Sequence, residues 1–312
     1  MNAAIRSIVR VASANGHKVV GIERGYQGLL AGDFKRLGPL DVSKILEKGG
    51  TVLRTARCDE MRTPEGLRKA ALALEKQGVD VLVAIGGDGT LRGCMDLSRY
   101  WRGQILGLPG TIDNDLWGTD VTIGFDTAVN TALNAIEKIR DTADSHERFF
   151  LVEVMGRHSG AIALEVAITC GAEEFLIPEI PFDLPAVRER LVAGKALGKT
   201  GSMLVVAEGA VRGGVHALAR RLGKLGDDEY RLCVLGHIQR GGSPTAADRL
   251  LATRLGAYAV EAALAGEDGK LVGESAGRPV LVAFDQTCGR KKTLDPWTMR
   301  MAPCLSAVGS AH

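Results

Sequence analysis

Short apolar runs alternate with longer amphipathic segments along most of the chain. The runs are rich in Val, Ile and Leu, and they predict strands at residues 18–22, 79–85, 104–108, 149–155, 203–207, 231–235 and 280–284. Because most positions in each run are apolar, instead of every second one, the runs are typical of parallel strands that are buried on both faces.

The segments between these runs place apolar residues three and four positions apart, a spacing that predicts helices. The helices are expected at residues 2–14, 91–100, 126–143, 159–170 and 246–265. Alternation of this kind predicts an α/β fold with doubly wound parallel sheets. We interpret the polar, Gly-rich segment 266–279 as a surface connection.

The helix at 2–14 is not preceded by a predicted strand, although a doubly wound domain normally leads into such a helix from one. One interpretation is a fold that begins with a helix. The other is a chain that lacks its first strand–helix unit, and we favour this second interpretation.

Composition and charge narrow the class of protein. The 312 residues allow one large or two medium domains. A net charge of +2 gives no reason to expect nucleic acid or an anionic membrane as partner. No apolar run approaches the roughly 18 residues of a membrane span, and the start does not resemble a signal peptide. The six cysteines are scattered without a C-x-x-C pair, so we expect reduced, buried thiols in a cytoplasmic protein.

The heptapeptide PGTIDND, residues 109–115, carries the most chemistry. It follows the strand expected at 105–108 and places Asp113 and Asp115 at the carboxyl end of that strand, where open sheets bind their ligands. One carboxylate could act as a general base while the other supplies charge for a metal or a substrate hydroxyl. The alternative is an Asx turn in which Asp113 and Asn114 only accept local backbone hydrogen bonds.

The segment GGDGT, residues 86–90, lies between a predicted strand and a predicted helix. Free N–H groups at a helix start and the helix dipole both favour a phosphate, and glycines let it approach the backbone. Asp88 within such an anion site points to Mg²⁺ bound together with a nucleotide. The alternative is a tight turn without function.

Two further strand ends carry cations. Arg157 in MGRHSG, residues 155–160, could clamp a phosphate, or it could face solvent without a partner. His237 and Arg240 follow the strand at 231–235 and suggest another anion site, although a lone His is more often a core residue. Together with Glu208 after the strand at 203–207, these groups indicate phosphoryl transfer from a nucleotide to a small phosphorylated molecule.

Four blocks then identify a resemblance. IGGDGT, PGTIDND, MGRHSG and LGHIQRGGSP occur at residues 85–90, 109–115, 155–160 and 235–244, and in this order they resemble the bacterial 6-phosphofructokinase family. The resemblance extends from residue 1 to about residue 300. NAD kinases share GGDGT but not the other three blocks.

The resemblance implies two doubly wound, Rossmann-like domains with an active site in the cleft between them. The nucleotide-binding domain is expected at 1–123 plus 240–285, and the fructose 6-phosphate-binding domain at 124–239 plus 286–312. The implied reaction transfers the γ-phosphoryl group of ATP to the 1-hydroxyl of fructose 6-phosphate, with Mg²⁺ as cofactor.

Site residues follow by position from the same resemblance. Asp113 matches the general base, Thr111 and Asp115 line its pocket, Arg157 stabilises the transferring phosphoryl group, and Asp88 holds Mg²⁺. The nucleotide side comprises Arg57, Cys58, Gly87, Asp88, Gly89 and Thr90. The sugar-phosphate side comprises Met155, Gly156, Glu208, His237 and Arg240.

Other matches imply shared sites between subunits. Arg148 and Arg231 match arginines that the family lends from a neighbouring subunit, which implies a homotetramer. Arg6, Arg10, Arg140 and Lys199 match an effector site for ADP or phosphoenolpyruvate. For Arg6 and Arg10 the alternative is the solvated face of the first helix.

The phosphoryl donor can be argued from two glycines. In the pyrophosphate-using branch of the family, Asp stands where this chain has Gly89, and Lys where it has Gly110. Glycine at both positions leaves room for a nucleoside, so we expect ATP as donor. A pyrophosphate-dependent enzyme and a non-catalytic regulatory homologue remain the alternatives.

The beginning of the chain departs from the family pattern. Family members open with a strand and a Gly-Gly-Asp loop, followed by the phrase GMNAAIR, and this sequence begins at the Met of that phrase. We therefore expect the first strand and one phosphate-binding loop to be missing, which would expose apolar sheet surface.

Overall fold

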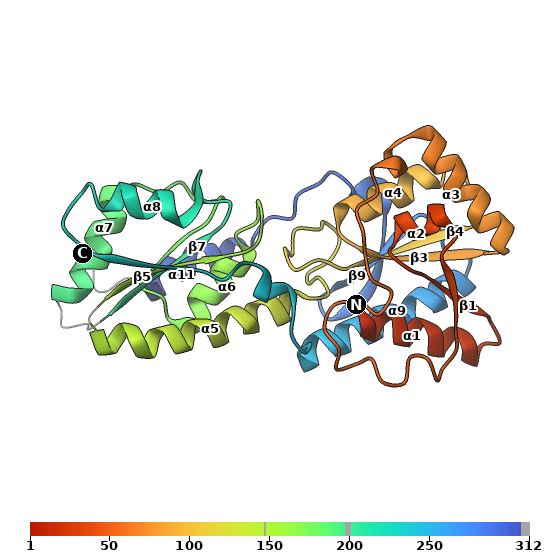
Figure 1. Ribbon diagram of the computed structural model, residues 1–312, viewed down its shortest axis with the longest axis horizontal. Helices are drawn as coiled ribbons and strands as arrows, with labels where there is room; N and C mark the ends of the chain where they lie inside the picture. The colour runs from red at the N-terminus through yellow and green to blue at the C-terminus, as the bar shows by residue number, and fades with distance from the viewer. Residues whose placement is uncertain (147, 197–200, 307–312) are drawn as a thin grey trace. The chain divides into compact units, whose positions relative to one another are not determined.

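The expected alternation of strands and helices occurs in two units of the chain, each built around its own sheets (Figure 1). In the computed structural model, residues 1–146, 148–196 and 201–306 are described. Unit 1 comprises Met1–Thr111, Leu116–Gly124 and Gly242–Lys292. Unit 2 comprises Ile112–Asp115, Phe125–Gly241 and the chain from Thr293 onward. Relative to the expected boundaries, the structure thus assigns 112–115 and 240–241 to unit 2, and 124 and 286–292 to unit 1. Which ligand each unit binds stays a prediction.

Unit 1 has a four-stranded sheet in the order β10-β9-β4-β3 and a separate two-stranded sheet, β1-β2. Strands β3, β4 and β9 are parallel, whereas β10 is antiparallel to β9 and β1 is antiparallel to β2. The strands are β1 (Val19–Ile22), β2 (Phe34–Leu37), β3 (Val81–Gly86), β4 (Gln104–Pro109), β9 (Lys270–Ser275) and β10 (Arg278–Ala283).

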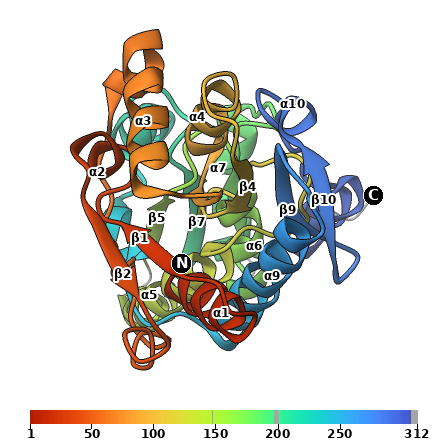
Figure 2. The same ribbon diagram turned by 90° about the vertical axis from the view of Figure 1, so that its right-hand side faces the viewer.

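Helices cover both faces of the larger sheet of unit 1. One apolar cluster joins the sheet to α2, α3 and α4, and another joins it to α1 and α9, which lie side by side (Figure 2). The helices are α1 (Asn2–Ala14), α2 (Tyr26–Ala31), η1 (Asp59–Arg62), α3 (Pro64–Gln77), α4 (Asp88–Leu97), α9 (Ala246–Leu264) and α10 (Phe284–Thr287).

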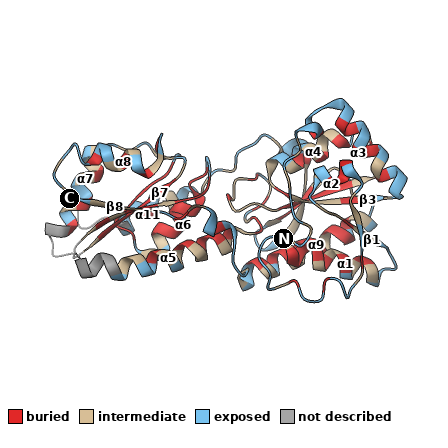
Figure 3. Ribbon diagram, viewed as in Figure 1, coloured by how far each residue is buried: buried red, intermediate tan, exposed pale blue. Residues whose placement is uncertain are grey.

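Unit 2 has one parallel sheet in the order β6-β7-β5-β8. Its strands are β5 (Phe149–Val154), β6 (Glu174–Leu176), β7 (Ser202–Ala207) and β8 (Tyr230–Val234). Every residue of β7 is buried (Figure 3). The helices are α5 (Phe125–His146), α6 (Ala161–Cys170), α7 (Leu184–Ala196), α8 (Gly214–Leu222), η2 (Gly236–Arg240) and α11 (Pro296–Ser306).

The structure confirms the α/β fold but corrects three expectations about its strands. The segment 266–279 is not a surface connection, because it contains β9, whose Leu271 and Val272 are fully buried. Strand β10 is not a buried parallel strand. It returns antiparallel to β9 through Ala276 and Gly277, whose positive φ angles of 48° and 73° suit a two-residue hairpin. Strand β1 is likewise antiparallel to its neighbour β2.

Two further expectations concern cysteines and membranes. All six cysteines, which lie within the described ranges, are free thiols, but the expectation that they are buried holds only for Cys94. Cys304 is exposed, and the other four are half-buried. Among the described residues, no helix combines the length and apolarity needed to cross a membrane.

Candidate active site

Asp113 is a buried carboxylate at the centre of the candidate acceptor side in unit 2. It is 6% exposed and follows β4 in a turn completed by Asn114, which has a positive φ of 47°. Burial and the neighbouring charge of Asp115 raise the pKa of the Asp113 carboxyl, while Arg157 opposes that rise. Its Oδ2 lies 3.6 Å from Nε of Arg157. A carboxylate with a raised pKa near a hydroxyl substrate is suited to act as a base near neutral pH.

Arg157 is presented by a strained turn that Glu208 holds in place. Gly156 and Arg157 have φ angles of 144° and 53°, and a Cβ on Gly156 would collide with the carbonyl oxygen of Ser159. Oε1 of Glu208 accepts hydrogen bonds from the N–H groups of Arg157 (2.6 Å) and Gly156 (3.3 Å). The backbone is therefore fixed at the carboxyl end of β5, while the side chain of Arg157 is 63% exposed and available to a ligand.

Gln239 is a positioning residue that the sequence did not single out. It is 1% exposed, and its Oε1 accepts a hydrogen bond of 2.8 Å from the N–H of Met155. It lies within η2, between His237 and Arg240. The sequence block LGHIQRGGSP includes Gln239, but nothing in the block indicates that its side chain binds the backbone of Met155. His237 is exposed, so the interpretation of it as a core residue is wrong, and Arg240 is exposed as well.

The strand ends thus bring most of the predicted sugar-phosphate residues to one edge of the sheet in unit 2. Met155 and Gly156 follow β5, Glu208 follows β7, and His237 and Arg240 follow β8. Arg148 and Arg231 do not join them. Arg148 precedes β5, and Arg231 is the second residue of β8, so both lie at the amino ends of parallel strands, at the opposite edge of the sheet.

The candidate phosphate loop of unit 1 leads from β3 into α4. Asp88 is the first residue of α4, where unpaired N–H groups and the helix dipole favour an anion. Its Oδ2 accepts a hydrogen bond of 2.7 Å from Nε of Arg92, and its Oδ1 accepts one of 3.2 Å from the N–H of Gly289. The contact with Gly289 could not be expected from the sequence, because 201 positions separate the two residues.

The chemistry of Asp88 fits a Mg²⁺ ion held jointly with phosphate oxygens. Proteins usually bind Mg²⁺ through one or two carboxylates plus substrate phosphates. The side chain of Asp88 is 38% exposed and lies at a helix start. Within the described ranges, no group of three or more His, Cys, Asp or Glu side chains gathers as a metal site.

Gly89 and Gly110 have different surroundings. A Cβ on Gly89 would meet no atom within 4 Å, so a side chain there would occupy open space beside the start of α4. A Cβ on Gly110 would approach Cγ2 of Ile85 to 3.0 Å and the N of Gly86 to 3.1 Å, which is tight against backbone. Open space at Gly89 is what a bulky nucleoside donor requires.

The other residues predicted on the nucleotide side lie in unit 1. Gly87 precedes α4, and Thr90 belongs to its first turn. Thr111, which was predicted to line the pocket of Asp113 instead, also belongs to unit 1. It follows β4, and its carbonyl oxygen accepts a hydrogen bond of 2.7 Å from Thr122. Arg57 is exposed and Cys58 half-buried in the segment ahead of η1.

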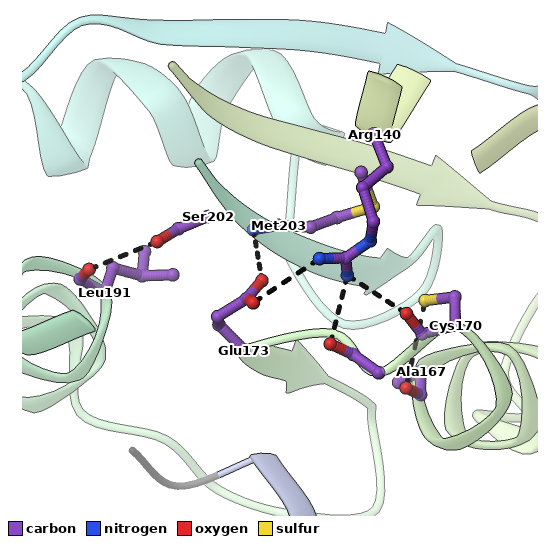
Figure 4. Close-up of polar contacts among 8 residues, drawn as sticks. Arg140, Ala167, Cys170, Glu173, Leu191, Ser202 and Met203 are labelled. Carbon is purple, nitrogen blue, oxygen red and sulfur yellow. Dashed lines mark hydrogen bonds and ion pairs between the residues drawn. The ribbon is translucent and has the colours of Figure 1, made fainter. Parts of the chain in front are cut away.

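The residues predicted to bind an effector have separate environments. Arg140 is engaged within unit 2, where its guanidinium donates to the carbonyl oxygens of Cys170 and Gly171, both at 3.0 Å, and pairs with Glu173 at 3.5 Å (Figure 4). Arg10 is exposed on α1 in unit 1. Nε of Arg6 is buried without a hydrogen-bond partner in the described part of the chain. Lys199 lies outside the described residues.

Known proteins resemble this chain over most of its length. A family model described as Phosphofructokinase matches residues 1–263. The chain is 52% identical over 306 residues to "ATP-dependent 6-phosphofructokinase 1" of Thermus thermophilus, covering 98% of this chain and 95% of that protein.

Solved structures agree with this match. A phosphofructokinase structure from Saccharomyces cerevisiae has a TM-score of 0.87 and 35% identity, and the match covers 92% of this chain but only 43% of that one. A pyrophosphate-dependent phosphofructokinase from Marinobacter aquaeolei has a TM-score of 0.83 over 99% of this chain and 88% of its own. At 21% identity, the second likeness shows the fold alone. The chain therefore belongs to the phosphofructokinase family.

Proposed function

We propose that this chain is an ATP-dependent 6-phosphofructokinase that phosphorylates the 1-hydroxyl of fructose 6-phosphate. The observation that carries this proposal is the buried Asp113, with its raised carboxyl pKa, 3.6 Å from the guanidinium of an arginine whose backbone Glu208 holds. The 52% identity to a relative named for ATP-dependent 6-phosphofructokinase activity supports the same reaction.

The residues of this chain have separate roles in the proposed reaction. The Asp113 carboxylate takes the proton of the 1-hydroxyl as that oxygen forms its bond to the γ-phosphorus of ATP, and ADP leaves with the electrons of the broken P–O bond. Arg157 stabilises the negative charge on the transferring group, because its guanidinium is permanently charged and exposed to the ligand. Asp115, Thr111 and the strand-end residues of unit 2 orient the sugar phosphate.

The donor side would depend on Mg²⁺ held by Asp88. When bound, the ion neutralises charge on the β- and γ-phosphates. Gly87 and the N–H groups at the start of α4 would bind phosphate oxygens, and Thr90, Arg57 and Cys58 would lie on the nucleotide side. The open space at Gly89 supports ATP over pyrophosphate as donor, because glycine places no side chain beside the phosphate loop.

We also propose a homotetramer with shared sites in the cytoplasm. Arg148 and Arg231 lie at the edge of the unit 2 sheet opposite Arg157, so within one chain they are remote from the acceptor side. A neighbouring subunit would have to supply them to a sugar phosphate. Arg6, Arg10, Arg140 and Lys199 are proposed to bind ADP or phosphoenolpyruvate, and Arg140 would first have to leave Glu173 in part.

The direct experiment measures formation of fructose 1,6-bisphosphate by the purified chain with fructose 6-phosphate and either Mg–ATP or Mg–pyrophosphate. We expect turnover with ATP. 1-Deoxyfructose 6-phosphate, which keeps the 6-phosphate but has no 1-hydroxyl, is the matched negative control. Turnover with pyrophosphate only would overturn the choice of donor, and no turnover with either donor would favour a non-catalytic homologue.

A further inference from the structure

Glu179 binds the far end of the turn that presents Arg157. This turn comprises residues 155–160 and joins β5 to α6 in unit 2. The N–H of Gly160 donates to both oxygens of the Glu179 carboxylate, at 2.9 Å to Oε1 and 3.2 Å to Oε2. Glu179 lies in the segment between β6 and α7, so the contact ties the turn to the carboxyl end of a further strand. Nothing in the sequence pattern singled out Glu179.

The Glu179 carboxylate can approach this backbone closely because Gly160 has no side chain. A Cβ on Gly160 would lie 2.5 Å from Oε2 of Glu179 and 2.5 Å from Cβ of Ile177. Gly160 directly precedes α6, whose first turn contains no acidic side chain of its own. Glu179 therefore supplies both a hydrogen-bond acceptor and the negative charge that a helix start favours.

The contact with Glu179 completes a set of side-chain acceptors along the turn. Glu208 and Gln239 bind its first part, and Glu179 binds its last residue. The N–H groups bound by these three side chains are those of Met155, Gly156, Arg157 and Gly160. Because two of the three acceptors are carboxylates, which repel a phosphate, the turn attracts an anion through the guanidinium of Arg157 instead of through these N–H groups.

The backbone of Arg157 is strained and needs support on both sides. Its φ of 53° lies in the left-handed region, which a non-glycine residue occupies only where its surroundings hold it there. Glu208 binds its N–H, and a Cβ on Gly209 would lie only 1.9 Å from its carbonyl oxygen, so both of its peptide groups are confined. The chain leaves the turn at Gly160, where the carboxylate of Glu179 fixes it.

We propose that Glu179 is a positioning residue for the transfer reaction and acts on the transferring phosphoryl group only through Arg157. By fixing Gly160, it keeps the strained turn closed and holds Nε of Arg157 at 3.6 Å from Oδ2 of Asp113. Without this contact the turn would relax toward an ordinary φ, and the guanidinium would leave its place beside the base. This role depends on the charge stabilisation proposed above for Arg157, so the experiments test the two roles separately.

Steady-state kinetics of Glu179→Ala measure the effect on the reaction. We expect kcat to fall about tenfold, the effect of losing one hydrogen bond to a charged group. The KM for fructose 6-phosphate should stay within about twofold, because Glu208 and Gln239 still hold the start of the turn. Glu179→Gln keeps an acceptor oxygen and should recover most of the rate. An unchanged kcat in Glu179→Ala, or an equal loss in both variants, would overturn the proposal.

A double-mutant cycle with Arg157→Leu tests whether Glu179 acts through Arg157. We expect Arg157→Leu alone to lower kcat on the order of a hundredfold or more. Adding Glu179→Ala to it should change kcat less than about twofold. Additive losses would show that Glu179 acts independently of Arg157 and would overturn the proposal. An unchanged kcat in Arg157→Leu would instead overturn the role of Arg157, and the role of Glu179 with it.

Hydrogen exchange of the unliganded chain gives a readout that does not depend on turnover. In Glu179→Ala we expect faster exchange at Gly160 and also at Arg157, although Glu208 still binds the N–H of Arg157. Exchange in β7 should stay unchanged. Faster exchange at Gly160 alone would show that Glu179 has only a local effect and would overturn the proposal.

Asp183→Ala is the matched control. Oδ2 of Asp183 accepts a hydrogen bond of 3.1 Å from the N–H of Ala186 at the start of α7, so this variant removes a helix-capping carboxylate four positions from Glu179. We expect it to keep the kcat of the unmodified chain, and thermal unfolding checks that both variants are folded. A fall in kcat equal to that of Glu179→Ala would show a general loosening of unit 2 and would overturn the proposal.

Discussion

The two units share a layered α/β architecture. They differ in how completely their strands are buried and in how many strand-end N–H groups are hydrogen-bonded by side chains. In unit 2, β7 is buried throughout, and the side chains of Gln239 and Glu208 accept hydrogen bonds from the N–H groups of the β5 strand end. In unit 1, β3 is half-buried beside a cavity of about 980 Å³. The strand ends of unit 2 are thus held by side-chain hydrogen bonds, whereas β3 of unit 1 borders open space.

One ion pair in each unit shows the same contrast. Arg140 in unit 2 pairs with Glu173, whose side chain is only 5% exposed and also accepts a hydrogen bond of 2.7 Å from the N–H of Met203. Arg92 in unit 1 pairs with Asp88 on a solvent-facing part of α4. Buried pairs leave an uncompensated charge when one partner is removed, and exposed pairs do not.

The largest expected effect follows replacement of the proposed base. Asp113→Asn should lower kcat roughly a thousandfold, within the 10²- to 10⁴-fold contribution of general base catalysis. Fructose 6-phosphate should still bind, because Glu208 and Gln239 continue to hold the strand ends. Steady-state kinetics and calorimetric titration with the sugar phosphate measure the two quantities.

The matched change in unit 1 replaces Asp88, the proposed Mg²⁺ ligand, and distinguishes its role from that of Asp113. Asp88→Asn should raise the Mg²⁺ concentration at half-maximal rate, and excess Mg²⁺ should restore part of the turnover. Excess Mg²⁺ should leave Asp113→Asn unchanged. Equal rescue of both variants would contradict the separation of an acceptor-side base from a donor-side ligand.

The next effect concerns stability and compares the two ion pairs directly. Arg140→Met leaves Glu173 buried without its cation, and we expect it to lower the free energy of unfolding by about 2–3 kcal/mol. Arg92→Met removes an exposed i,i+4 pair and should change that energy by about 0.5 kcal/mol or less. Urea unfolding of both variants measures the difference, and similar losses would show that burial does not separate the two pairs.

The correct predictions of the fold came mainly from the local pattern of apolar residues. The apolar runs at β4, β5 and β7 correctly predicted buried strands, whereas the equally apolar β3 is only half-buried. The carboxyl ends of parallel strands necessarily share an edge of their sheet. For that reason the grouping of Met155, Glu208 and Arg240 could be predicted from the sequence alone. The resemblance to phosphofructokinases, which the family match confirms, added the expected role of each of these residues.

Long-range pairing accounts for what the sequence did not reveal. Strand β9 has only three consecutive apolar residues if Gly273 is included, so its Gly-rich surroundings favoured a loop, and its burial comes from pairing with β4 and β10. The contacts of Gln239 with Met155 and of Arg140 with Glu173 likewise join distant segments, and 84 positions separate the first pair. Neither contact has a periodic signature.

A smaller effect tests the open donor side. Gly89→Asp adds a carboxylate in free space next to the phosphate loop, and we expect the KM for ATP to rise roughly 10- to 100-fold through like-charge repulsion with the phosphates. Gly223→Asp makes the same chemical change at the end of α8 in unit 2 and serves as the control. An unchanged KM for ATP would show that the space beside Gly89 is not used by the donor.

The smallest effect concerns pH and the charges around Asp113. Because the base must be deprotonated, kcat/KM should increase as pH rises through the pKa of Asp113, which burial and Asp115 raise and Arg157 lowers. Asp115→Asn should therefore move the acidic limb of the pH profile to lower pH. Arg157→Leu should move it to higher pH while also reducing the rate. Rate profiles of the two variants against pH measure both shifts, and shifts in the same direction would contradict the opposite charges of these neighbours.

The raised pKa of Asp113 also has a consequence for stability. The folded state binds the proton more tightly than the unfolded state, so the stability contributed by protonated Asp113 is lost as pH rises through the folded pKa. Asp113→Asn should accordingly raise Tm at neutral pH, where the wild-type carboxylate is charged and buried, and the gain should vanish in acid. A Tm that falls equally at both pH values would contradict the raised pKa and leave Asp113 as an ordinary structural carboxylate.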